Sequence, residues 1–154
     1  MNDPLPSRMH VHGVFFSDGS DSAEWSPVDP TCFYVQGMAF VGPAEDGPTD
    51  AFDFAVCTPR WLVDAVEAAP TDGTLAGSRW WLAGRRVLLG RGMIFVARWT
   101  RQLVEQAITE AFSDISGPTW GFAAERAGRL LPWEYDYQHD DRIDDFMRNR
   151  PESL

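Results

Sequence analysis

Residues 50–62 read DAFDFAVCTPRWL, an alternating run that leads directly into a proline. Successive side chains of a strand point to opposite faces, so residues 51–57 predict a strand with its large apolar side chains on one face. Thr58 is a good helix N-cap, and Pro59 suits the first helical position, where its missing N–H would have no partner. The stretch therefore predicts a strand joined without a loop to a helix. The apolar face consists of Phe52, Phe54 and Val56.

The remaining elements follow from the same patterns. Strands are predicted over 9–16 and 31–41, and again over 86–89 and 93–98, where a Gly-Arg-Gly kink separates two apolar runs. In 31–41 one face carries Cys32, Tyr34, Gln36, Met38 and Phe40, and the other carries Phe33, Val35, Gly37, Ala39 and Val41. The segment 69–84 is predicted to be a connection, and WEYDYQ (133–138) a short edge strand.

Helical spacing marks three further segments besides the one that Pro59 begins and Pro70 ends. The helix that begins at Pro59 has Trp61, Leu62, Ala65 and Val66 on its apolar stripe. A helix after Thr100 has Leu103, Val104, Ala107, Ile108, Ala111 and Phe112 there. A helix over 119–130 has Trp120, Ala123, Ala127, Leu130 and Leu131, and a last one after 139 has Ile143, Phe146 and Met147.

Runs of strands followed by helices favour an α+β fold, with a mainly antiparallel sheet covered by one layer of helices. The length of 154 residues fits a single domain over residues 1–154. With 44% apolar residues, the chain has enough material for one core without a metal or disulfide.

Charge narrows the classes of partner. Thirteen basic residues face 23 acidic ones, which gives a formal net charge of −10. This balance repels nucleic acid and anionic membranes and attracts basic partners. The first residues, MNDPLPSRMHVHG, lack the basic and apolar regions of a signal peptide, so we expect the protein to act in the cytoplasm.

Cys57 has two interpretations. A thiol at the start of a helix can have a lowered pKa and act as a nucleophile, with His10 or His12 as its base. Alternatively, Cys57 shares its strand face with Ala51 and Ala55 and is a small core residue. We favour the core.

His10 and His12 lie two residues apart, so both could bind a metal with Cys32 or Asp53 completing the site. The spacing alone is weak, because no second ligand cluster such as Cys-x-x-Cys accompanies it. GRRVLLGRG leads into a strand, whereas phosphate loops open a helix. The sequence thus predicts no catalytic residues, no cofactor and no metal.

The acidic segment that follows Trp133 also has two interpretations. Its acids can form a solvated face and favour a helix N-terminus. They can instead join two tyrosines in a surface that offers aromatic anchors and acceptors to a basic partner. The candidate partner-binding residues are Glu134, Tyr135, Asp136, Tyr137, Asp140 and Asp141.

The order of these motifs resembles the immunity protein 8 family of bacterial polymorphic toxin systems. The similarity lies in SPVDPTCFYVQGMAFVGP (26–43), AFDFAVCTPRWL, LLGRGMIFVARWT (88–100), GPTWGF (117–122) and WEYDYQ. It covers about residues 14–138, and leaves 139–154 as a short acidic C-terminal helix or tail. The most characteristic positions are Cys57, Thr58, Pro59, Trp61, Leu62, Gly90, Arg91, Trp120 and Trp133.

The resemblance implies a small protein without enzymatic activity that binds and neutralises the toxin domain of a cognate effector, often a nuclease. The excess of acid suits this role, since opposite fields accelerate association with a basic enzyme. Two alternatives from other classes are a small cysteine-dependent enzyme and a chaperone or adaptor of a secreted effector.

Overall fold

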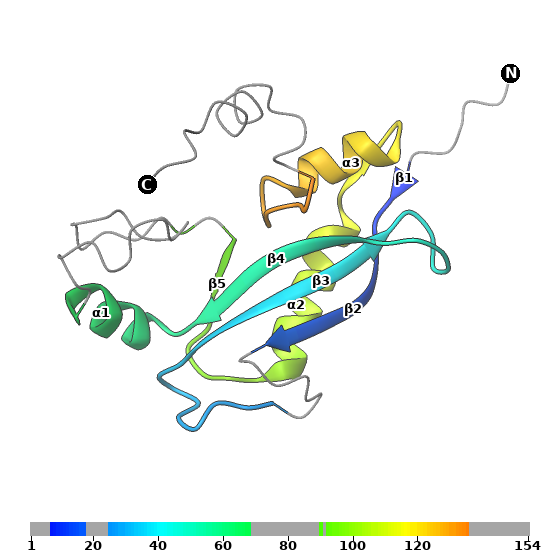
Figure 1. Ribbon diagram of the computed structural model, residues 1–154. Helices are drawn as coiled ribbons and strands as arrows, with labels where there is room; N and C mark the ends of the chain where they lie inside the picture. Colours follow the sequence, from blue (N-terminus) through cyan, green and yellow to red (C-terminus); the bar gives the residue numbers. More distant parts are fainter. Residues whose placement is uncertain (1–6, 18–24, 69–89, 91, 136–154) are drawn as a thin grey trace, which may run out of the picture.

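The structure is a computed structural model that describes residues 7–17, 25–68, 90 and 92–135. Its main sheet has the strand order β2 (His10–Ser17), β3 (Tyr34–Gly42), β4 (Asp50–Cys57) and β5 (Met93–Phe95). The first two pairs are antiparallel, whereas β4 and β5 are parallel (Figure 1). The predicted α+β fold with a mainly antiparallel sheet is therefore confirmed, with one parallel pair that makes the sheet mixed.

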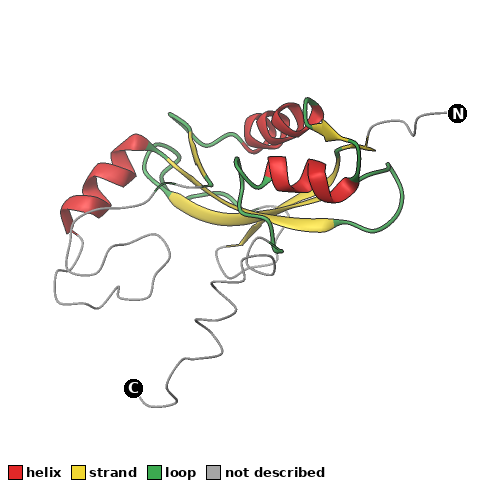
Figure 2. Ribbon diagram, turned by 90° about the horizontal axis from the view of Figure 1, so that it is seen from above, coloured by secondary structure: helices red, strands yellow, loops and turns green. Residues whose placement is uncertain are grey.

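Three helices accompany this sheet: α1 (Pro59–Ala68), α2 (Arg101–Ser113) and α3 (Trp120–Ala127). Figure 2 shows α2 and α3 together on one side of the sheet, while α1 extends from one end of it. The predicted layer of helices thus consists of α2 and α3. The residues of α1 are exposed or half-buried, because this helix continues outward from the end of β4.

The core lies between the sheet and the layer of α2 and α3. The strand faces predicted from the alternation are observed, because Val35, Ala39 and Val41 of one strand and Phe52, Phe54 and Val56 of the next are all buried. On the opposite face of β4, Ala55 and Cys57 are buried as well. From the sheet the core contains Val35, Ala39, Val41, Phe52, Phe54 and Val56. From the helices it contains Val104, Ile108, Phe112, Ala123, Ala124 and Ala127.

The helix stripes are narrower than predicted. Val104, Ile108 and Phe112 face the sheet at a spacing of four residues, and Leu103 lies beside this line with 53% of its surface exposed. Leu130, which was predicted on the stripe of the next helix, lies beyond the end of α3 at Ala127 and is 49% exposed. The apolar pattern marked the right helices but overstated how many of their residues reach the core.

The outer edge of β4 is closed by two separate segments. The N–H of Asp53 donates to the carbonyl of Pro132 (2.8 Å), and the N–H of Ala55 donates to the carbonyl of Gly92 (2.9 Å). Gly92 has φ +73°, and a Cβ atom there would lie 2.5 Å from Cδ of Pro132. Glycine is thus needed both for the backbone conformation and for the close approach of these two segments.

Several predicted elements differ from the observed ones. The strand predicted over 93–98 is limited to Met93–Phe95, and in 133–135 the predicted edge strand consists of one bridge, from Trp133 to Phe52. A small sheet of β1 (Ser7–Arg8) and β6 (Ser116–Gly117) was not predicted, because two-residue strands carry no periodic pattern. The predicted connection 69–84, the strand 86–89 and the last helix lie outside the described residues.

Asp50, at the start of β4, connects the sheet to Trp120 and Trp133. Its Oδ2 accepts hydrogen bonds from Nε1 of Trp120 (2.8 Å) and from Nε1 of Trp133 (3.1 Å). Buried indole N–H groups need such acceptors, and a carboxylate is a stronger acceptor than a neutral oxygen. One side chain therefore holds α3 and the segment after it against the sheet.

We predict that Asp50→Ala lowers the free energy of unfolding by about 2–3 kcal/mol, because two indole N–H groups lose a charged acceptor. Asp50→Asn keeps an oxygen at the same place and should cost less. Urea denaturation monitored by tryptophan fluorescence measures both values. Asp46→Ala, in the exposed turn before β4, is the control and should change stability by less than about 0.5 kcal/mol.

Candidate functional site

Cys57 lies at the junction of β4 and α1 and is fully buried. Burial raises the pKa of its thiol to about 11, whereas a nucleophilic cysteine requires a lowered pKa. Cys57 pairs with Tyr34 at one end of β3, and His10 pairs with Gly42 at the other end, roughly 25 Å away at the usual rise per residue. The proposed pairing of Cys57 with His10 or His12 is therefore wrong.

The residues considered for a metal site are also dispersed. His12 lies within hydrogen-bonding distance of the carbonyl of Ala44 (2.7 Å), at the hairpin between β3 and β4. Asp53 lies in the middle of β4, and Cys32 precedes β3 at the opposite end. Within the described part of the chain, no three His, Cys, Asp or Glu side chains are grouped so that they could hold a metal ion.

Two of the candidate partner-binding residues have internal contacts. The N–H of Glu134 donates to the carbonyl of Ala51 (3.0 Å), and its carboxylate accepts from the N–H of Ala51 (2.7 Å). The ring of Tyr135 packs edge to face on Trp133, with 5.4 Å between the centroids. Contact of these residues with a partner stays a prediction. Asp136, Tyr137, Asp140 and Asp141 lie outside the described residues.

The characteristic positions around the start of α1 have structural roles. Thr58 is buried, and its hydroxyl accepts a hydrogen bond from the N–H of Trp61 (3.3 Å), as the predicted N-cap requires. The ring of Trp61 stacks on Tyr34 with 4.6 Å between centroids. Gly90 accepts from the N–H of Met93 (3.2 Å) and closes the turn before β5. Arg91 lies outside the described residues.

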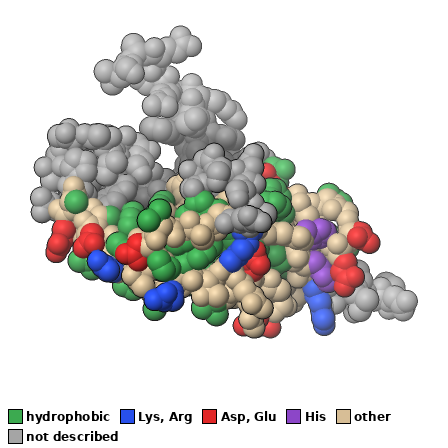
Figure 3. All heavy atoms as spheres, turned by 90° about the horizontal axis from the view of Figure 1, so that it is seen from below, with side chains coloured by type: hydrophobic (Ala, Val, Ile, Leu, Met, Phe, Trp, Pro, Cys, Tyr) green, Lys and Arg blue, Asp and Glu red, His purple; other side chains and the backbone are tan. Residues whose placement is uncertain are grey.

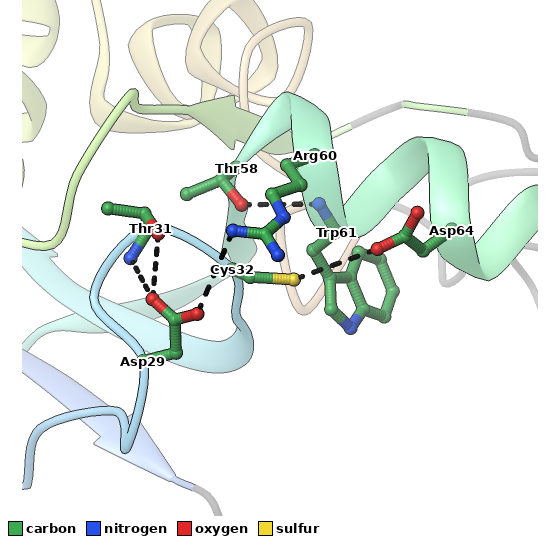
Figure 4. A network of polar contacts seen from close by, with 7 residues as sticks. All are labelled: Asp29, Thr31, Cys32, Thr58, Arg60, Trp61 and Asp64. Carbon is green, nitrogen blue, oxygen red and sulfur yellow. Dashed lines mark hydrogen bonds and ion pairs between the residues drawn. The ribbon is translucent and has the colours of Figure 1, made fainter.

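A polar network joins the loop before β3 to α1 (Figure 4). Asp29 accepts hydrogen bonds from the hydroxyl (2.7 Å) and the N–H (2.8 Å) of Thr31, and these bonds lower the pKa of its carboxyl group. Arg60 approaches the same carboxylate at 4.0 Å, and Sγ of Cys32 lies 4.0 Å from Oδ2 of Asp64. The charged groups of this network, Asp29, Arg60 and Asp64, are exposed, so the network orients the loop and adds little stability.

The sheet face opposite the helix layer carries exposed apolar side chains. Phe15 on β2 is 57% exposed and Met38 on β3 is 40% exposed. The strand register places these two residues opposite each other, and Phe40 packs edge to face on Phe15 at 5.4 Å. We call Phe15, Met38 and Phe40 the apolar strip. The sequence had assigned Met38 and Phe40 to one strand face but did not identify them as a surface.

Acidic side chains lie at both ends of this face. Glu45 and Asp46 are exposed in the turn between β3 and β4, and Asp64 and Glu67 are exposed on α1. The view from below (Figure 3) shows hydrophobic side chains along the middle of the molecule, and both acidic and basic side chains toward its two ends. This arrangement is suited to contact with a protein rather than to catalysis.

An apolar groove of about 220 Å³ lies on the helix side of the sheet, between β5, α2 and the segment after α3. It is lined by Met93, Ile94, Ala107, Ile108, Ala111, Phe112, Leu130 and Leu131. Its lining offers no titratable group, so it is not a candidate for acid–base chemistry. Among the described residues there is also no helix with the length and apolar character to span a membrane.

Comparison with known proteins gives one result. A family model described as Immunity protein 8 matches residues 10–137, most of the chain. No curated protein and no solved structure is a significant match to the chain.

Thiol labelling tests the assignment of Cys57 to the core. At pH 8 a thiol of pKa about 11 is ionised in about one molecule in a thousand. We therefore expect iodoacetamide to modify Cys57 of the folded Cys32→Ser variant at least about 100-fold more slowly than in urea. The Cys57→Ala variant, which retains only the partly exposed Cys32, is the control. Rapid labelling of folded Cys32→Ser would contradict the assignment.

Proposed function

The chain belongs to the immunity protein 8 family, so it is an immunity protein directed against a toxin, and we propose that it neutralises its cognate toxin domain in the cytoplasm by steric and electrostatic blocking. The family match over residues 10–137 carries this proposal. The toxin would be the variable C-terminal domain of a secreted effector, and a nuclease is the class that best fits.

The charge of the chain supports this choice of target. A formal net charge of −10 favours a basic partner, and enzymes that bind a phosphate backbone are commonly basic at their active site. An acidic inhibitor would approach such a site rapidly and compete with the nucleic acid for the same cationic groups. Inhibition of this kind needs no chemistry by the inhibitor, in keeping with the buried thiol of Cys57.

Co-expression tests the proposed function. The effector domain encoded beside this gene should arrest growth of a bacterial host when expressed alone, and co-expression of this chain should restore growth. A host that still arrests, although both proteins are made, would contradict neutralisation. Binding without protection would instead indicate a chaperone or adaptor.

We further predict that the double variant Asp140→Asn, Asp141→Asn associates with the toxin domain more slowly and with a weaker dependence on salt. If these acids contact the toxin domain, loss of their two negative charges reduces electrostatic steering, with an expected decrease of about threefold to tenfold in association rate at low salt. Stopped-flow mixing over a salt series measures this.

The matched control is Glu110→Gln, Asp114→Asn, which removes the same charge from the end of α2 and its C-cap on the helix side. An equal decrease in association rate for both double variants would mean that the total charge of the protein sets this rate, rather than the position of the C-terminal acids. If the association rate of Asp140→Asn, Asp141→Asn is unchanged, the contact with the toxin domain does not involve these two acids.

A further inference from the structure

We propose that the toxin domain docks on the open face of the main sheet, with the apolar strip of Phe15, Met38 and Phe40 at the centre of the contact. This inference rests on the proposed function and names the surface that performs it. The partner surface should carry apolar side chains between arginine or lysine side chains.

The apolar strip is a continuous surface that spans two strands. Phe15 on β2 lies opposite Met38 on β3, and the rings of Phe15 and Phe40 are in edge-to-face contact. Phe15 and Met38 keep 57% and 40% of their surface exposed. Adjacent exposed aromatic and Met side chains are typical of the centre of protein interfaces, where such residues supply most of the binding energy.

Besides the apolar strip, the open face, which is the sheet face opposite α2 and α3, carries polar side chains, as the surround of an interface centre does. The strands β3 and β4 place the polar side chains of Gln36 and Asp53 on the open side, where Ala55 and Cys57 near the α1 end are buried. The inner side is apolar apart from Asp50. Glu45 and Asp46 lie beyond one end of the face, and the acids of α1 lie beyond the other. An apolar centre between two acidic ends is complementary to an apolar contact flanked by cationic side chains.

The same charges disfavour a second copy of this chain as the occupant. Acids outnumber bases at both ends of the face, with Arg60 as the exposed base on α1, so either orientation of a second copy brings carboxylates toward carboxylates. With a net charge of −10 on each copy, self-association would be opposed by repulsion. A basic toxin domain would experience attraction at the same positions.

The position of Glu134 connects this face with the acidic segment that follows it. Ala51 is the cross-strand neighbour of Phe40, and Glu134 is bound to both the N–H and the carbonyl of Ala51. Glu134, the first of the candidate partner-binding residues, therefore lies across β4 from the apolar strip, and it would be at the rim of a contact that covers the strip.

Binding of purified variants to the catalytically inactivated effector domain encoded beside this gene tests the proposal. Phe15→Ser and Met38→Glu should each weaken binding by about 10-fold to 100-fold, mainly through faster dissociation, as for residues at the centre of an interface. The control is Leu103→Ser on α2, which removes an equally exposed apolar side chain (53%) from the helix side and should change affinity less than about twofold.

Gln36→Arg is a third variant that keeps the test valid if either strip variant unfolds. Gln36 is exposed on the same face, and arginine there removes no apolar contact but places a cation opposite a basic partner. It should weaken binding at least about fivefold, more at low salt than at high salt. Thermal denaturation identifies which variants are folded.

The outcomes separate the surface from the function. If the unaltered chain binds and protects while folded Phe15→Ser, Met38→Glu and Gln36→Arg bind as tightly, the proposed surface is wrong and the function stands. If the unaltered chain neither binds nor protects, the proposed function itself fails. A native dimer in sedimentation that Phe15→Ser dissociates would also overturn the proposal, because a second copy would then occupy the face.

Discussion

The backbone hydrogen bonds of β4 are the constraint on which the rest of the structure depends. A buried strand must pair its N–H and carbonyl groups on both edges, since an unpaired polar group in a core is costly. The strand β3 satisfies one edge of β4 along its length. On the other edge the chain returns twice, first at Gly92–Phe95 and later at Pro132–Glu134. Segments that lie far apart in the sequence therefore become neighbours.

Because two segments bond to the same edge of β4, residues that are distant in the sequence support one another. Gly92 allows the segment Gly92–Phe95 to approach Pro132 closely. Asp50 binds Trp120 and Trp133, and so positions α3 and the segment Pro132–Glu134. The helix layer is thereby fixed over one face of the sheet. The opposite face keeps its apolar strip exposed between acidic ends, which is the feature that suits it to a basic protein partner.

Sequence patterns predicted the elements with strong periodicity and missed those held by long-range pairing. The alternation of Phe52, Phe54 and Val56 specified both a strand and its buried face, and Thr58 with Pro59 specified the start of α1. The pairing of β1 with β6 and the parallel addition of β5 depend on contacts between distant segments, which leave no local pattern. The groups considered for a nucleophile or a metal failed for the same reason, because strand register separates them.

By itself, the sequence determined the fold class, the division of residues 31–41 and 51–57 into two strand faces, and the family, because these follow from local periodicity and from motifs in order. The acid excess, which favours a basic partner, is also a property of composition alone. Only the tertiary structure decided that Cys57 is buried far from His10, that Asp50 joins Trp120 to Trp133, and that the apolar strip lies on the face opposite α2 and α3. These features depend on register and on which face the helices cover, and both are set by packing between distant segments.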